Sequence, residues 1–452
     1  MNLRTIENIY HRTKSYIERN GVAEAAVRSV EGVKDSLRNV CYSREARLAR
    51  NDCGSVAADF DKEYKISLLV PTYNTDPQYL RELLISFAKQ TYRNFEVIIA
   101  DASDTEIVKN TVDGFISSDE KLTEIHYKKL ESNEGISGNT NAALALATGD
   151  FVAPVDHDDF LSDNALAEVM IALQGEVDIV YTDEDKYYGP QDKYFSPNRK
   201  PDFNLDLLLS NNYICHLFVV RRDIANAVGG FRSEFDGAQD YDFILRCIEK
   251  SGSDRVAHVD RIVYHWRASD GSTADNPESK LYAYESGRRV VEAYLERRGL
   301  KGEVVHTKHR GFYRINYEMP EDAAYKMLLD KKLIPMRNDY EERLAAYFAR
   351  EEVGAVGGRI VGSLGNIICN GYTTDACGRR VSLYAKMNQK FSGYMHRASM
   401  QQDVEAVSNH ACVVRQELLQ YYDKDSMKMF ENIRRAGYLV VIDPEVVFTY
   451  IR

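Results

Sequence analysis

The segment "KISLLVPTYN" at residues 65–74 joins a strand-length apolar run to a polar cluster. The same pattern returns in "FEVIIADAS" (95–103) and in "DFVAPVDHDD" (150–159). Short apolar runs of this kind predict buried β-strands. Asp76 and Pro77 predict the start of a helix that extends to about Gln90, because Asp is a favoured N-cap and Pro suits the first turn. Strands that alternate with helices predict an α/β fold, with a mostly parallel sheet covered by helices.

Three further segments continue this alternation. Residues 123–129 and 177–182 predict strands, and "GISGNTNAALALA" (135–147) predicts a helix. Right-handed crossovers would place the carboxyl ends of the strands along one edge, where open α/β sheets bind ligands. We therefore expect the polar side chains that follow the strands to form one ligand site. They are Pro71, Thr72, Tyr73 and Asn74, then Asp101, then Asn133 and Gly135, and finally Asp156, His157, Asp158 and Asp159.

The last of these clusters has three carboxylates within four residues, in "DHDD" (156–159). Adjacent carboxylates repel one another, so a cation or a strong donor is needed to keep them ionised together. Oxygen ligands suit Mg²⁺ or Mn²⁺, which commonly share their coordination with substrate phosphates. A solvated acidic turn is the alternative interpretation. The neighbouring strand-end clusters favour a metal site.

Several segments together resemble the family 2 glycosyltransferases, which are inverting enzymes of GT-A fold. They are "SLLVPTYN", "FEVIIADAS", "NEGISGNTNAALALATGDFVAPVDHDD", "YTDEDK", "VGGF…GAQDYDFILR" and "VYHWR", in that order, between residue 65 and about residue 310. Within that family the chain is similar to bacterial polysaccharide and O-antigen transferases, some of them described as rhamnosyltransferases. The resemblance implies a nucleotide-sugar donor, with UDP or dTDP as the nucleotide, and a glycan or lipid-linked glycan acceptor.

The resemblance also assigns residues to the donor. Pro71, Thr72, Tyr73 and Asn74 would line the nucleotide site, Asp101 would face the base, and Asp156 would contact the ribose. Asn133, Gly135 and Asn141 match the start of a helix in the family. Many relatives have Arg just before that last Asn, where this chain has Thr140.

The chemical roles follow from the same resemblance. Asp158 would hold Mn²⁺ or Mg²⁺ on the diphosphate, and His265 would join the metal ligands; a satisfied histidine at a strand edge is the alternative. Asp240 would be the general base, with Gln239 in place of the family's Glu. Asp242 lies two residues further on, so it points to a different helix face. One base and no covalent nucleophile fit a single inverting displacement.

Other polar or aromatic residues are candidate sugar or acceptor contacts. Asp159 belongs to the acidic turn, and Asp183, Glu184 and Asp185 follow a predicted strand, where they could instead form a turn. Trp266 is the only tryptophan and either packs internally or stacks on a sugar.

Residues 1–62 form a separate segment in this prediction. The first fifty residues carry ten Lys and Arg against six Asp and Glu, and Val22, Val27, Val30, Val33, Leu37 and Val40 recur every three to five residues. This spacing predicts a basic amphipathic helix. Such a helix packs on the next domain or on a second copy, or it lies on an anionic membrane surface. The stripe has no Trp or Phe anchor, which favours packing.

Residues 63–318 form the predicted catalytic domain, and residues 319–452 predict a truncated, non-catalytic copy of it. "YKMLLDKKLIP" (325–335) parallels the acidic turn but has Asp330, Lys331 and Lys332 where acids would stand. The end of the chain (434–452) parallels residues 249–267 and puts Thr449 opposite His265. Lysines cannot assemble a divalent site. We expect this domain to pack, to form a dimer interface or to bind acceptor glycan.

Composition excludes several classes of protein. The balance of 58 Lys and Arg against 69 Asp and Glu gives a net charge of −11, which does not suit general nucleic-acid binding. No apolar run has membrane-spanning length, and seven cysteines without a C-x-x-C pair predict a reducing, cytoplasmic location, with a peripheral membrane contact through residues 1–50 as an option. A glycan-binding scaffold and a sugar nucleotidyltransferase are the competing functions. The latter would need a glycine-rich basic loop after the first strand, which "VPTYNTDPQYL" lacks.

Overall fold

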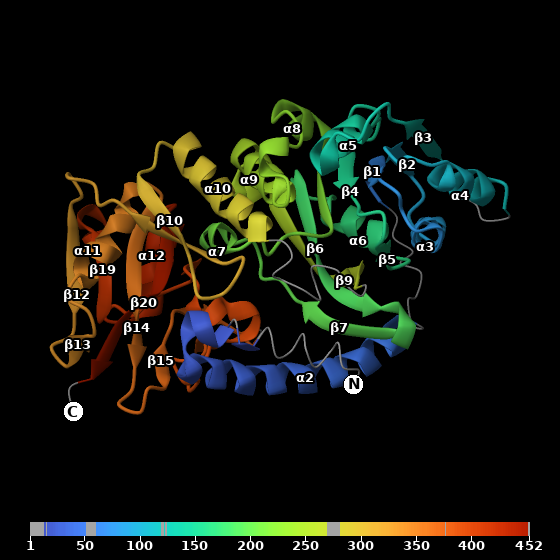
Figure 1. The fold of residues 1–452 in the computed structure, drawn as a ribbon. Coiled ribbons are helices and arrows are strands. Elements are labelled where there is room, and N and C mark those ends of the chain that lie inside the picture. The colour runs from blue at the N-terminus through green and yellow to red at the C-terminus, as the bar shows by residue number, and fades with distance from the viewer. Residues whose placement is uncertain are drawn as a thin grey trace. The chain divides into compact units, whose positions relative to one another are not determined.

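The computed structural model in Figure 1 describes residues 13–14, 16–50, 60–118, 122, 124–268, 281–375 and 377–450. Contacts group the chain into two compact units. The nine-stranded unit comprises residues 34–203 and 213–290, and the seven-stranded unit comprises residues 1–33, 204–212 and 291–452. These units differ from the three predicted domains, whose boundaries stay a prediction.

The nine-stranded sheet has the order β3-β2-β1-β4-β8-β6-β9-β5, with β7 paired to β6. Its strands are β1 (Ile66–Thr72), β2 (Phe95–Asp101), β3 (Ile125–Lys129), β4 (Phe151–Pro154), β5 (Phe160–Leu161), β6 (Ile179–Tyr188), β7 (Lys193–Asn198), β8 (Phe218–Arg221) and β9 (Val256–Arg267). Its helices are α3 (Pro77–Ala88), α4 (Ile107–Ile116), α5 (Gly135–Leu144), α6 (Ala165–Ala172), α8 (Arg222–Ala227), α9 (Gln239–Ser251) and α10 (Leu281–Arg297), the last of which continues into the other unit. Short 3₁₀ turns are η1 (Gly189–Gln191), η2 (Ser233–Phe235) and η3 (Ser253–Arg255).

The expected α/β fold is confirmed, and its parallel part is the run β3-β2-β1-β4. Both β1 and β2 are buried along their whole length, which explains their continuous apolar sequence. Beyond β4 the sheet is mixed, because β8 runs antiparallel to both β4 and β6, whereas β6 and β9 are parallel. The predicted cap of α3 is also present, since the backbone N–H of Gln78 donates to Asp76 at 2.8 Å.

Helix α2 (Val22–Arg50) confirms the helix predicted near the N-terminus, while residues 1–12 and 51–59 lie outside the described residues. Four residues of its apolar stripe, Val22, Val30, Val33 and Leu37, are exposed, whereas Val27 is half-buried. Two polar side chains of this helix make hydrogen bonds to distant parts of the chain. In the seven-stranded unit Glu31 accepts hydrogen bonds from Ser392, and in the nine-stranded unit Tyr42 donates to Asp185. None of the described helices has the length and apolarity that crossing a bilayer requires.

The seven-stranded sheet has the order β12-β19-β14-β20-β13, with β15 paired to β14 and β18 to β20. Its strands are β12 (Tyr325–Leu329), β13 (Leu333–Pro335), β14 (Val353–Val361), β15 (Ile367–Cys369), β18 (Gln402–Asp403), β19 (Ala411–Arg415) and β20 (Leu439–Tyr450). Two small ladders accompany it, β10 (Gly302–His306) with β11 (Tyr313–Tyr317) and β16 (Tyr372–Thr374) with β17 (Arg380–Ser382). Its helices are α7 (Leu205–Ser210), α11 (Tyr340–Ala345) and α12 (Ser426–Arg435), with 3₁₀ turns η4 (Ala346–Ala349), η5 (Tyr394–Ser399) and η6 (Gln416–Tyr421).

This sheet repeats half of the larger one. The order β12-β19-β14-β20-β13 corresponds to β4-β8-β6-β9-β5, and each successive pair runs in the same relative direction. His265 pairs with Phe160 in one sheet, and Thr449 pairs with Ile334 in the other. The described part of the smaller sheet has no counterpart of β1, β2 and β3. The predicted truncated copy is therefore present as a repeat of strand topology.

The glycine-rich run "VGGRIVG" (356–362) serves packing. A Cβ at Gly357 would collide with Val407, and one at Gly358 would collide with Phe448. Both residues lie in β14, whose side chains are buried along its length. Glycine is therefore required here because two bulky neighbours contact the strand backbone.

We expect Gly357→Ala to lower the free energy of unfolding by about 1–3 kcal/mol, since overpacking a filled core forces its neighbours to shift. Gly114→Ala is the matched control, because a Cβ there meets nothing within 4 Å in helix α4. Alanine is the better helix former by about 1 kcal/mol, so the control should keep or gain stability. Chemical denaturation measures both, and equal stability of Gly357→Ala and the parent would contradict the packing argument.

Candidate active site

The ends of β1 and β2 meet as predicted. Thr72 and Asp101 are register partners, and the Thr72 hydroxyl donates to Asp101 at 3.2 Å. Asp101 is fully buried and also accepts from the backbone of Ser103 at 3.0 Å and from the Tyr127 hydroxyl at 2.7 Å. Burial raises the pKa of Asp101, but these hydrogen bonds outweigh it and hold the pKa below its usual value. Asp101 thus organises the strand ends as a buried anion.

The exposed groups at this place come from the loop after β1. Tyr73 is 43% exposed, and its hydroxyl donates to Asp104 at 3.1 Å. Asn74 has a φ of 49° and exchanges hydrogen bonds with Asp104, whose backbone N–H donates to the Asn74 amide oxygen at 3.2 Å. Tyr73 and Asn74, rather than Asp101, are therefore the exposed side chains at these strand ends.

Asparagine side chains form the hydrogen bonds that hold the start of α5. Asn133 accepts from the backbone of Gly135 at 3.1 Å and from the Asn139 amide at 2.9 Å. Gly135 has a φ of +77°, and a Cβ there would lie 2.8 Å from a carboxylate oxygen of Asp236. Asn141 is hydrogen-bonded twice to the backbone of Phe231, at 2.8 Å each way. In this structure the amide of Asn141 is used to join α5 to the segment before α9.

The carboxylates of the acidic turn (residues 156–159) differ in how deeply they are buried. The Asp156 side chain is 47% exposed, whereas Asp159 is fully buried. Asp159 accepts from the Tyr264 hydroxyl at 2.6 Å and from the backbone of Arg267 at 2.8 Å. The expected sugar contact of Asp159 is therefore replaced by a structural role, because each of its oxygens accepts a hydrogen bond from β9. Burial raises the pKa of Asp158, and the neighbouring Asp156 charge adds to that rise.

Two residues that the sequence did not single out lie beside this turn. The His216 imidazole Nε2 is 3.7 Å from an Asp156 oxygen, and its ring stacks on Tyr264 with centroids 4.7 Å apart. Cys215 lies next to it, with its sulfur 3.9 Å from an Asp240 oxygen. Neither belongs to a recognisable motif. The only signal in the sequence was their place just before a strand, in "NNYICHLF" (211–218).

Asp240 and Asp242 have different environments, as their spacing predicted. Asp242 is fully buried and pairs with Arg232 at 2.5 Å and with Arg246 at 2.6 Å. Burial raises the pKa of Asp240, the positive field of His216 opposes that rise, and the net effect is an increase. A carboxyl group with a raised pKa is the stronger base once ionised. The structure therefore separates an ion-paired acid, Asp242, from Asp240, whose pKa burial raises.

Asp183, Glu184 and Asp185 lie within strand β6, and all three are buried. Asp183 accepts from His258 at 2.9 Å, and Asp185 accepts from the Tyr42 hydroxyl at 2.6 Å. Neither a turn nor an exposed sugar contact is formed. These acids connect strands and loops beneath the site.

Glu184 and Lys200 hold the segment that carries His216. The Lys200 side chain is fully buried and lies 3.3 Å from Glu184, and it donates to the carbonyls of Ile214 and His216. Glu184 accepts from the backbone N–H of His216 at 3.1 Å. His216 is thus bound through both its N–H and its carbonyl by one buried ion pair.

His265 differs from its expected role. Its Nδ1 is 2.6 Å from Asp185, and its Nε2 is 2.8 Å from the Ser162 hydroxyl. Each ring nitrogen therefore has a protein partner, which matches the strand-edge alternative. Trp266 packs partly against the hydrophobic core, and the Lys186 ammonium lies 4.3 Å from the centre of its ring.

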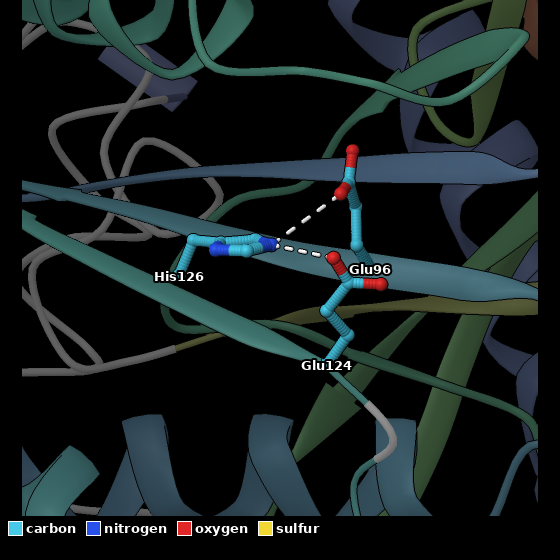
Figure 2. Close-up of side chains that lie close together, drawn as sticks. All are labelled: Glu96, Glu124 and His126. Carbon is cyan, nitrogen blue, oxygen red and sulfur yellow. Dashed lines mark hydrogen bonds and ion pairs between the residues drawn. The ribbon is translucent and has the colours of Figure 1, made fainter.

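A second group of acids lies at the opposite ends of β2 and β3. Figure 2 shows Glu96, Glu124 and His126, with His126 Nε2 2.8 Å from Glu124 and 3.5 Å from Glu96. Lys65 already neutralises this cluster at 2.8 Å from Glu96 and 2.9 Å from Glu124. Burial would raise the pKa of Glu96, yet hydrogen bonds led by Lys65 lower it to about 2. This cluster is a structural ion network.

We expect Lys200→Met to lower the free energy of unfolding by about 3 kcal/mol or more, because it leaves the carboxylate of Glu184 buried without its partner. Adding Glu184→Gln should restore part of the loss, since the double variant buries no unpaired charge. Lys109→Met is the control, because the Lys109–Asp113 pair is about half exposed and should contribute less than about 1 kcal/mol. If Lys200→Met denatured at the same urea concentration as the parent, the Glu184–Lys200 ion pair would contribute nothing to the free energy of unfolding.

Comparison with known proteins finds a family match that lies mostly within the nine-stranded unit. Residues 67–229 match the family model described as Glycosyl transferase family 2. The chain is 40% identical over 235 residues to "Uncharacterized protein y4gI" of Sinorhizobium fredii, covering 51% of this chain and 25% of that protein. It is 34% identical over 267 residues to "O-antigen biosynthesis protein RfbC" of Myxococcus xanthus, covering 58% of this chain and 20% of that protein.

A solved structure is also similar over part of its length. The structure of Staphylococcus aureus TarS 1-349 in complex with UDP-GlcNAc is 23% identical with a TM-score of 0.41, covering 51% of this chain and 66% of that one. The chain spans a quarter of the length of the Sinorhizobium relative and a fifth of the length of the Myxococcus relative. The matched region contains β1, α5, the acidic turn and His216. Residues 67–229 of this chain are thus similar in sequence to glycosyl transferase family 2 domains.

Proposed function

We propose that this chain transfers a sugar from a nucleotide-diphosphate sugar to a glycan or lipid-linked glycan during surface polysaccharide synthesis. The donor would carry UDP or dTDP, with dTDP-rhamnose as one candidate, and the anomeric centre would be inverted. The name of the Myxococcus relative, an O-antigen biosynthesis protein, supports the polysaccharide context. The observation that carries the proposal is the grouping of Asp156, His216 and Asp240 beyond the sheet.

The donor-side residues fit a divalent cation. Asp156 offers a half-exposed carboxylate, Asp158 lies two residues further along the turn, and His216 offers an imidazole nitrogen 3.7 Å from Asp156. Carboxylate and imidazole ligands suit Mn²⁺, and carboxylates suit Mg²⁺. When bound, such an ion would neutralise charge on the diphosphate leaving group. Asp156 and Asp158 would hold the ion. The Glu184–Lys200 ion pair, which binds the backbone of His216, would keep the imidazole beside Asp156.

Asp240 would act on the acceptor. Its carboxylate would take the proton of the acceptor hydroxyl while that oxygen forms the new bond to the anomeric carbon. The bond from that carbon to the donor phosphate would break in the same displacement, which gives inversion. The burial that raises the pKa of Asp240 strengthens it as a base, provided that it is ionised when the acceptor binds.

The seven-stranded unit would not catalyse transfer. Its turn holds Asp330, whose carboxylate accepts from the backbone of Lys332 at 2.8 Å, and Lys332 stands where the larger unit has Asp158. Lysine ammonium groups repel a cation and cannot ligate it. One catalytic site per chain is therefore proposed, in the nine-stranded unit.

The metal is tested by donor binding. Calorimetric affinity for UDP or dTDP should fall by about tenfold or more, which equals about 1.4 kcal/mol, on addition of chelator or in Asp158→Ala. Asp330→Ala, in the corresponding turn of the repeat, should bind nucleotide as the parent does, with one site per chain. Affinity that is independent of Mn²⁺ would refute the metal role.

The base is tested by Asp240→Asn, which keeps the shape of the side chain but cannot accept the proton. Sugar transfer should fall by ~10²–10⁴-fold, while donor affinity stays within about twofold, because the base acts in the transition state. Asp330→Asn is the matched control and should transfer at the parental rate. Parental turnover in Asp240→Asn would assign the base elsewhere.

A further inference from the structure

Two adjoining cavities of about 260 and 560 Å³ run along helix α3 in the nine-stranded unit. They share Glu82 and Tyr187, so we treat them as one groove, named here the α3 groove. One wall is a single face of α3 and its C-cap, formed by Gln78, Tyr79, Glu82, Ile85, Ser86 and Lys89. A helix of this length, 12 residues, extends for about 18 Å. The groove is therefore elongated.

The opposite wall consists of β5 and the residues around Tyr187 and Arg267. Figure 1 shows α3 beside β5, and the backbone N–H of Leu161 donates to Ser86 at 3.2 Å. These contacts join the groove to the strand that directly follows the acidic turn.

Arg267 lies between the groove and the turn. Its Nε donates to the carbonyl of Asp158 at 2.7 Å, and its Nη2 lies 2.7 Å from Glu82. Its guanidinium also lies 4.6 Å from the centre of the Tyr79 ring and 5.7 Å from that of Tyr187. Arg267 is buried, so one side chain spans from the donor-side turn to the centre of the groove.

The chemistry of the walls fits an uncharged, hydroxyl-rich ligand. Glu82 and Asp163 balance Lys89 and Arg267, so the groove carries no net charge. Planar polar groups such as those of Gln78 and Glu82 can bind vicinal hydroxyls, and tyrosine rings offer faces to the C–H groups of a pyranose. A polyanion or a lipid surface would instead need an excess of basic residues.

We propose that the α3 groove binds a neutral oligosaccharide of several units, as the acceptor or product chain of the transfer reaction. This inference rests on the proposed function, because that function supplies the oligosaccharide. Arg267 makes the groove continuous with the acidic turn, so a bound chain would extend away from the donor site along α3. The longest chains would reach Lys89 at the far end of the helix.

The test uses the full chain and saturation-transfer NMR with neutral oligosaccharides of hexoses, deoxyhexoses and N-acetylhexosamines, from disaccharides to hexasaccharides. Anionic oligosaccharides of the same lengths are included. Affinity should rise with length among the neutral members. Tyr79→Ala should weaken binding by about three- to tenfold, the effect of losing one aromatic face, and Tyr79→Phe should restore it.

Two more variants control for folding and for position. Lys89→Ala, at an exposed position, should weaken only the longest oligosaccharides. Tyr422→Ala removes a tyrosine that is 54% exposed in the other unit, and it should bind as the parent does.

The outcomes separate this inference from the proposed function. No binding of any neutral member, binding of anionic members alone, or parental binding by both Tyr79→Ala and Lys89→Ala would overturn the α3 groove as a glycan site. Nucleotide binding with Mn²⁺ is measured on the same samples. If nucleotide binding fails while the oligosaccharides bind as expected, the proposed donor chemistry is refuted, and the groove remains a glycan site.

Discussion

The buried carboxylate of Asp159 is the interaction on which the site depends. It accepts hydrogen bonds from Tyr264 and from the backbone of Arg267, which fastens the acidic turn to β9. With that carboxylate fixed inside, Asp156 remains half-exposed in the same turn. Tyr264 also supports His216 by stacking, so one anchored turn sets the places of the groups proposed to act on the donor.

Buried ion pairs hold two neighbouring segments, the loop before β8 and the start of α9. Lys200 and Glu184 bind His216 from both sides of its backbone, and Arg232 and Arg246 bind Asp242 at the start of α9. Removing one partner of such a pair costs far more than the net stability of the pair, because an isolated charge is left inside. The buried charges therefore explain how the loop before β8 holds His216, and how the first turn of α9, which carries Asp240, is held in place.

The seven-stranded sheet repeats part of the strand topology of the larger sheet without the acids of the turn at residues 156–159. It keeps the order and directions of five strands, and its core is filled by residues such as Val407 and Phe448 against the glycines of β14. Among the described residues it lacks the three strands whose counterparts end at Thr72, Asp101 and Lys129. Its turn has lysines in place of acids. Packing is therefore compatible with the same strand topology in both sheets, whereas the residues proposed to act on the donor occur in the nine-stranded unit.

The amino-acid sequence by itself determined the parallel strands, the capped helix α3, the acidic turn, the different faces of Asp240 and Asp242, and the repeat in the second half. Each of these follows from local periodicity or from residue spacing, which a single chain displays directly. Only the tertiary structure decided that His216 lies beside Asp156, that His265 is held between Asp185 and Ser162, and that Asp183, Glu184 and Asp185 are buried. The reason is physical: whether a polar side chain faces solvent or a buried partner depends on residues distant in sequence, such as Tyr42 for Asp185.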